Sequence, residues 1–150
     1  MSAVLTLPIR TQVRDAFVAA LNTIDASPTV RQPGGLVVTN YLAVNELKKF
    51  PTYCVVVTNE ELTVETQMVA DVLLQALVVI YARDETDVRA ALDGAIEDAW
   101  EAIRIGQMVK SACGFLELKT IETDEGTTIA KPFAQAVMKW TAHVRREVSW

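Results

Sequence analysis

The chain has 150 residues, a formal net charge of −5 and a hydrophobic fraction of 51%. Its length is ordinarily one domain, and its negative charge argues against broad attraction to nucleic acid, because phosphate binding depends on clustered Lys and Arg. No stretch approaches the roughly 18 consecutive apolar residues of a membrane span, and the first residues, MSAVLTLPIR, lack the basic segment of a signal peptide. We therefore expect one domain that is neither secreted nor held in a membrane.

A first amphipathic helix is predicted from about Pro8 to Ile24. Proline suits the first helical turn, where its missing N–H would have no partner, and Ser27-Pro28 ends the pattern. Such a stripe predicts a helix held by docking one face on a core. The apolar positions are Ile9, Val13, Phe17, Ala20, Leu21 and Ile24.

The segment between Ser27 and Pro51 is the least domain-like part of the chain, and its second part, Asn40 to Phe50, has no clean helical or strand period. Its turn sequence, Gln32-Pro33-Gly34-Gly35, lies between two short apolar runs. We predict a protruding loop or hairpin arm over about residues 27–50, whose apolar side chains make contacts outside the subunit. The candidate contact residues are Leu36, Val38, Tyr41 and Leu42, together with Trp150 at the end of the sequence.

Four strands are predicted after the arm. A β-branched run at Thr52–Thr58 indicates a covered strand, and a turn at Asn59–Glu61 leads to the next. In the long strand from Met68 to Ala82, alternate residues form one apolar face. The third strand is expected at Gly114–Thr123, and the last, half-buried strand runs from about Pro132 to Arg146.

A second helix is predicted between the long strand and the third strand. Asp84 is the expected N-cap, apolar residues recur at helical spacing from Val88 to Ile103, and Gly106 is a stop signal. Trp100 on this helix and Trp140 on the last strand are predicted core residues. Tight turns make strands antiparallel, so we expect an α+β fold: a four-stranded, mostly antiparallel sheet with two helices on one face.

Three features could carry chemistry, and each has a simpler structural explanation. Asp93, Glu97 and Glu101 line one helix face, but a metal site would need ligands from a second element, so a solvated or subunit-facing acidic surface is the alternative. The single histidine, His143, has no acid or nucleophile at a spacing that would make it a general base. Neither Cys54 nor Cys113 is at metal-ligand spacing, and both are expected to be buried free thiols. We predict no catalytic, cofactor or metal site and no enzymatic activity.

The predicted elements follow a characteristic order: a helix, an arm, two strands, a helix and a final strand pair. The segments that carry this order most clearly are KFPTYCVVV (residues 49–57), VVIYA (78–82), the helix 87–105 and MKWTAHV (138–144). This arrangement resembles the tail terminator, or tail completion, proteins of long-tailed bacteriophages.

The resemblance implies a structural virion protein that forms a homohexameric ring on the head-proximal end of the tail tube. Such a ring stops tube polymerisation and gives the head connector a docking surface for head–tail joining. The implied partners are further copies of the chain, the tail tube protein and a connector or neck protein. The implied place is the neck of the virion after assembly in the host cytoplasm, with DNA passing through unbound. The alternatives are another neck or tail component, or a small α+β enzyme or ligand-binding protein.

Overall fold

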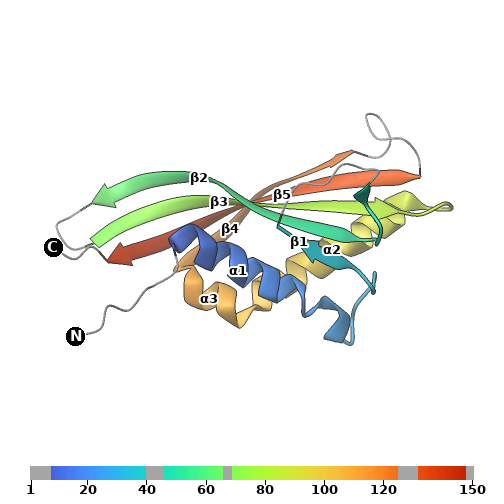
Figure 1. Ribbon diagram of the computed structural model, residues 1–150, viewed down its shortest axis with the longest axis horizontal. Coiled ribbons are helices and arrows are strands. Elements are labelled where there is room, and N and C mark those ends of the chain that lie inside the picture. Colours follow the sequence, from blue (N-terminus) through green and yellow to red (C-terminus); the bar gives the residue numbers. More distant parts are fainter. Residues whose placement is uncertain (1–7, 40–45, 66–68, 125–131, 148–150) are drawn as a thin grey trace.

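The computed structural model describes residues 8–39, 46–65, 69–124 and 132–147. It is a mixed α+β domain in which the helices cover one face of a single sheet (Figure 1). The predicted α+β class is therefore confirmed. In chain order the elements are α1 (Ile9–Leu21), the 3₁₀ helix η1 (Ile24–Ala26), β1 (Leu36–Val38), β2 (Thr52–Glu65), β3 (Val69–Arg83), α2 (Val88–Ile105), α3 (Gln107–Ala112), β4 (Phe115–Asp124) and β5 (Phe133–Glu147).

The sheet has five strands in the order β1-β2-β3-β5-β4, one more than predicted. The pairs β2–β3, β3–β5 and β4–β5 are antiparallel, while β1 pairs with β2 in parallel. Since β5 lies between β3 and β4, α2 carries the chain across β5 to the far edge of the sheet. The mostly antiparallel sheet and the helical crossover are as predicted, and the additional strand is the short β1.

The turn predicted at Asn59–Glu61 is wrong, because β2 continues to Glu65. A register shift between Val57 and Asn59 inserts one residue against β3, which is the signature of a β-bulge. Beyond it, Glu60 and Glu61 remain paired with β3 and point into solvent. Polar composition therefore marks the solvated half of this strand rather than its end.

The main core lies between the helices and the sheet. Phe17 of α1 contacts Trp140 of β5 edge to face, with ring centroids 6.1 Å apart, so the core position predicted for Trp140 is confirmed. Small residues such as Ala76 and Ala136 are fully buried beneath the helices, which lets helix and sheet approach closely. Each large apolar side chain buried here contributes on the order of 1.5–3 kcal/mol before entropy is subtracted.

Both ends of α2 differ in detail from the prediction. The N-cap is Asp87, whose carboxylate accepts from the backbone N–H of Ala90 at 3.0 Å. Asp84, the predicted cap, instead accepts from the N–H groups of Asp87 and Thr86, and these bonds lower the pKa of its carboxyl. At the other end Gly106 does stop α2, but α3 begins at the next residue and packs against α1.

Within the described residues, the predicted arm does not protrude. Residues 27–39, which we call the strap, run along the edge of the domain and contribute β1, whose Leu36 pairs with Thr52. Val30 and Val37 pack against the main core. The prediction failed because the apolar residues of the strap find partners within the same chain. Residues 40–45, the middle of the predicted arm, lie outside the described residues.

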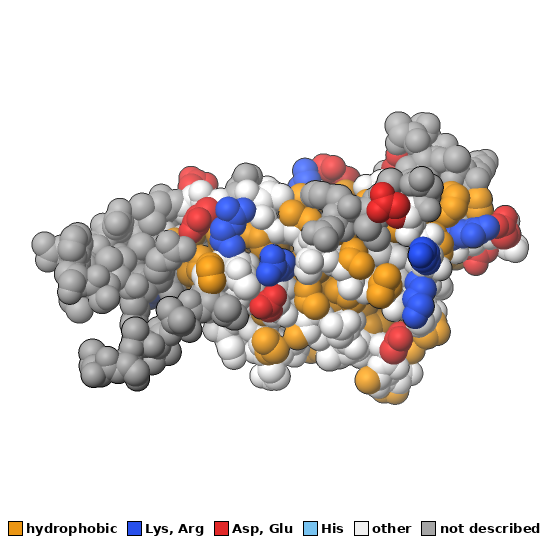
Figure 2. Space-filling view, viewed as in Figure 1, with side chains coloured by type: hydrophobic (Ala, Val, Ile, Leu, Met, Phe, Trp, Pro, Cys, Tyr) orange, Lys and Arg blue, Asp and Glu red, His pale blue; other side chains and the backbone are white. Residues whose placement is uncertain are grey.

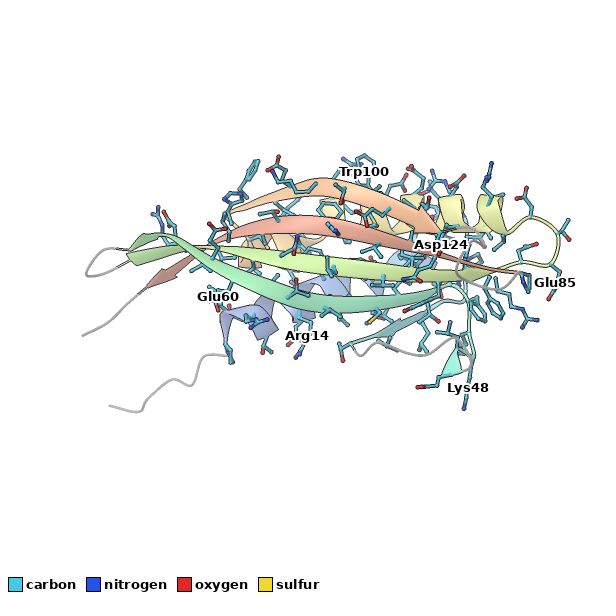
Figure 3. All side chains as sticks on the ribbon, turned by 90° about the horizontal axis from the view of Figure 1, so that it is seen from above. Arg14, Lys48, Glu60, Glu85, Trp100 and Asp124 are labelled. Atoms are coloured by element: carbon cyan, nitrogen blue, oxygen red, sulfur yellow. The ribbon has the colours of Figure 1, made fainter. Side chains whose placement is uncertain are left out.

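Among the described residues, the sheet face turned away from the helices, here called the open face, is covered only at one end. A small cluster of Cys54, Val79 and Tyr81 is buried there under partly buried neighbours that include Leu47 and Phe50. Elsewhere the residues of β3 that point to this face are half-buried. Figure 3 looks onto the open face, with the helices behind the sheet.

Candidate interaction surfaces

The structure separates the residues predicted to contact other subunits. Leu36 lies on the edge strand β1 with 38% of its surface exposed, so it is available for contact. Val38 is half-buried against the cluster around Cys54 and belongs to the fold. Tyr41, Leu42 and Trp150 lie outside the described residues.

A buried carboxylate, Asp98 of α2, holds the strap in place. It is only 4% exposed and accepts the backbone N–H groups of Arg31, at 3.0 and 3.1 Å, and Gln32, at 2.8 Å. Sequence reasoning did not identify this role. The available signal was its position on the helix, seven residues after Ala91 and four before Ala102, which places an acid in a row of buried alanines.

Glu101 also faces the strap and does not belong to a purely solvated acidic surface. Its carboxylate pairs with the guanidinium of Arg31 at 3.2 Å, and this hydrogen bond is the largest contribution raising the pKa of Arg31. Gly94 allows the close fit, because a Cβ there would lie 3.1 Å from Cγ of Gln32. One side of α2 is therefore used to anchor the strap.

The other side of α2, which we call the α2 flank, consists of Asp93, Glu97, Trp100 and Arg104. Trp100 was predicted to be a core residue, and this is wrong: it is 36% exposed, with the Arg104 guanidinium 4.8 Å from its ring centroid. The reason is that α2 packs mainly on β3 and β5, not on β4. Trp100 therefore lies at the β4 edge of the molecule (Figure 3).

Other large apolar side chains are exposed at the C-terminal end of α2, on α3 and along β4. Such groups are normal when scattered singly, but a group of them marks a surface suited to contact with another protein. Besides Leu36 and Trp100, they are Ile105, Met108, Phe115 and Ile121.

The opposite edge of the domain carries basic side chains on α1. Arg10 donates to the backbone carbonyls of Val57, at 2.8 Å, and Thr58, at 3.3 Å, along the edge of β2. Arg14, one turn later, has its Nε 3.7 Å from the carboxylate of Asp15. We call Arg10 and Arg14 the α1 flank. Figure 2 views this side, where basic, acidic and hydrophobic groups are interspersed.

The residues considered as candidates for catalysis or metal binding lie in structural surroundings. The ring of His143 contacts that of Phe115 edge to face, at a centroid distance of 5.3 Å. Cys54 and Cys113 are buried free thiols, as predicted, and burial raises the pKa of each to about 11, so they are protonated near neutrality. Among the described residues, no group of His, Cys, Asp or Glu is arranged to hold a metal ion.

No protein-family model and no curated protein matches this sequence. Within the described part of the chain, no helix is both long and apolar enough to cross a membrane. The fold and its surfaces are therefore the basis on which a function can be proposed.

Proposed function

We propose that this chain is a tail terminator-like structural protein that forms a ring on the head-proximal end of a bacteriophage tail tube. The ring would end polymerisation of the tube and present the surface to which a head connector or neck protein binds. The tube protein and further copies of the chain are the other partners, and the neck of the virion is the site of action.

The observation that carries this proposal is the distribution of exposed groups around a well-buried core. Trp100, Ile121 and Phe115 are exposed on the β4 side of the domain, and Leu36 is exposed on the β1 side. Because β1 and β4 are the two edges of the sheet, contact surfaces lie on opposite sides of one subunit. A subunit with contact surfaces on opposite sides suits lateral packing into a closed ring. The order of elements that resembles tail terminators supports the same function.

The charge of the chain fits a ring through which DNA passes. Binding to duplex DNA gains most of its affinity from Lys and Arg that neutralise phosphates. Here the net charge is −5, and one of the cations, Arg31, is paired with the carboxylates of Asp98 and Glu101. We expect weak, salt-sensitive DNA binding at most. Nanomolar retention of duplex DNA by the purified protein at physiological salt would contradict the proposed function.

Two experiments test the proposal together. Negative-stain images and a mass measurement of the purified protein should show a hollow ring, most simply of six copies. Antibodies against the chain should label phage particles at the junction of head and tail. If neither a ring in solution nor labelling at the neck is found, the proposal is wrong. Labelling elsewhere on the tail would instead indicate a different structural component of the particle.

A further inference from the structure

Two helices in this fold carry like-charged pairs one turn apart. Arg10 and Arg14 are four residues apart on α1, and Asp93 and Glu97 are four residues apart on α2. Like charges at this spacing weaken a helix slightly, so opposite charge placed against them would stabilise it. The two pairs have opposite sign.

Neither pair is compensated by a strong ion pair within the described residues. None of the salt bridges there involves Asp93 or Glu97. Arg10 binds two neutral carbonyls, and the contact between Arg14 and Asp15 is long, at 3.7 Å, with both side chains at least 40% exposed. Both pairs therefore present charge to the outside, while Arg104, the cation of the α2 flank, lies over the ring of Trp100.

The two flanks lie at opposite edges of the domain. Arg10 contacts β2 at Val57, on the β1 side of the sheet, while Trp100 lies at the β4 edge. Figure 3 labels Arg14 and Trp100 on opposite edges of the sheet. Because they lie at opposite edges of one domain, the flanks can complement each other only between two copies of the chain.

We infer that copies of this chain bind head to tail, with the α1 flank of one copy against the α2 flank of the next. Arg10 and Arg14 would meet Asp93 and Glu97, and the exposed ring of Trp100 would supply apolar area beside these pairs. A contact between two different surfaces repeats around a ring, and complementary charge fixes which surfaces meet. The inference rests on the proposed function, since it names the interface that would close the ring.

Charge reversal on each flank provides the test. Arg14→Glu and Glu97→Lys each place like charges across the proposed contact. Sedimentation velocity at low salt, over a range of protein concentrations, should show association weakened at least about tenfold in either variant. An equimolar mixture of the two variants should assemble again, because each altered flank then faces the complementary altered flank of the other variant. The restored species should be larger than a dimer.

Matched controls separate this interface from net charge and from folding. The single variants Lys110→Glu and Glu46→Lys change the net charge by the same amounts as Arg14→Glu and Glu97→Lys, respectively, at exposed positions outside both flanks, and each should assemble like the unaltered chain. Urea midpoints of all variants check folding. If Arg14→Glu lowers stability, Asp93→Lys tests the contact from the exposed α2 flank.

Each possible result decides the inference. Assembly that is insensitive to both reversals, or variants that fail to restore each other, would overturn the head-to-tail contact while leaving a ring at the neck possible through other surfaces. A chain that remains monomeric at low salt up to millimolar concentration would also overturn it, and neck labelling would still decide the proposed function separately. A mixture that forms only a dimer would show a two-fold contact instead.

Discussion

The two faces of the sheet can be compared at adjacent residues of β3. Leu74 points to the helices and is completely buried, whereas Leu73 points to the open face and is half-buried. The same alternation continues along β5, where Ala142 is buried and its neighbours Thr141 and His143 are half-buried. Successive side chains of a strand point to opposite faces, so neighbours in sequence have different environments.

The difference indicates which face of the sheet stabilises the fold and which face is available to bind other chains. Helices α1, α2 and α3 close one face, so substitutions there remove packing that nothing replaces. In the part of the chain that the structure describes, the open face is closed only at the end where Leu47 and Phe50 cover Cys54. The rest of that face, together with the exposed flanks, can change without unfolding the domain, which leaves it available for contacts with other chains.

The largest expected effect comes from the matched pair in β3. Leu74→Ala should lower the free energy of unfolding by about 2–5 kcal/mol, because it leaves a cavity in a closed core. Leu73→Ala should cost less than about 1 kcal/mol, since part of the side chain is already in water. Urea unfolding of both variants measures the difference. Equal losses would mean that the open face is as well packed as the helical one.

Removing the carboxylate that holds the strap should have the next largest effect. Asp98→Ala leaves the N–H groups of Arg31 and Gln32 without their acceptor, and we expect a loss of about 2–4 kcal/mol. Glu101→Ala, which removes a partly exposed ion pair with Arg31 and an exposed hydrogen bond from Thr29, should cost less than about 1 kcal/mol. Hydrogen exchange should show faster exchange of the Arg31 and Gln32 amides in Asp98→Ala. Unchanged protection of these amides would contradict the anchoring role.

The two thiols probe the two faces separately, because Cys54 lies in the cluster on the open face and Cys113 in the main core. Maleimide labelling of single-cysteine variants at pH 8 should modify Cys54 first. The side chains that cover Cys54, among them Leu47 and Phe50, are only partly buried. Mass spectrometry of timed samples measures the order. Faster labelling of Cys113 would show that the short helix α3 opens more readily than the open-face cluster.

The thiols also predict how stability depends on pH. Their pKa is about 11 in the folded chain, above the ordinary value of 9.0, so between these values the native state binds more protons than the unfolded state. Stability should therefore fall as pH rises from about 9 to 11. Replacing both thiols with alanine should make the free energy of unfolding fall less steeply over this pH range. Urea unfolding at several pH values measures that dependence. An unchanged slope would assign the effect to other groups.

The smallest effect is expected on the open face itself. Lys139 and Glu122 pair across β5 and β4 at 3.4 Å, and the Glu122 side chain is largely exposed. Lys139→Ala should change stability by less than about 1 kcal/mol, because exposed ion pairs are weak in water. Thermal unfolding of this variant and of the unaltered chain at low and high salt would measure the change in stability. A larger loss would indicate that this pair contributes to the packing of the two strands.

Much of the fold follows from local patterns in the sequence. The apolar stripe of α1, the alternation in β3 and β5, and the stop at Gly106 identified the principal elements near their observed ends. Two errors have local causes: the bulge in β2 resembles a turn in composition, and Asp84 and Asp87 are both plausible caps. Neither error changes the fold class.

The surfaces were harder to predict than the elements. Trp100 is apolar and lies one turn from buried residues, yet it is exposed because α2 packs mainly on β3 and β5. Asp98 looks like part of an acidic helix face, yet it is buried because the strap brings two N–H groups to it. Each outcome depends on an element distant in sequence.

The sequence by itself determined the class of the fold, the principal strands and helices, and the absence of a recognisable catalytic motif, because hydrophobic period and turn chemistry act within a few residues. Only the tertiary structure decided that the strap is anchored on α2, that Trp100 is exposed, and that the Arg10–Arg14 and Asp93–Glu97 pairs lie on opposite edges. These properties depend on which elements pack together, and packing joins residues far apart in sequence, such as Arg31 and Asp98, which are 67 positions apart.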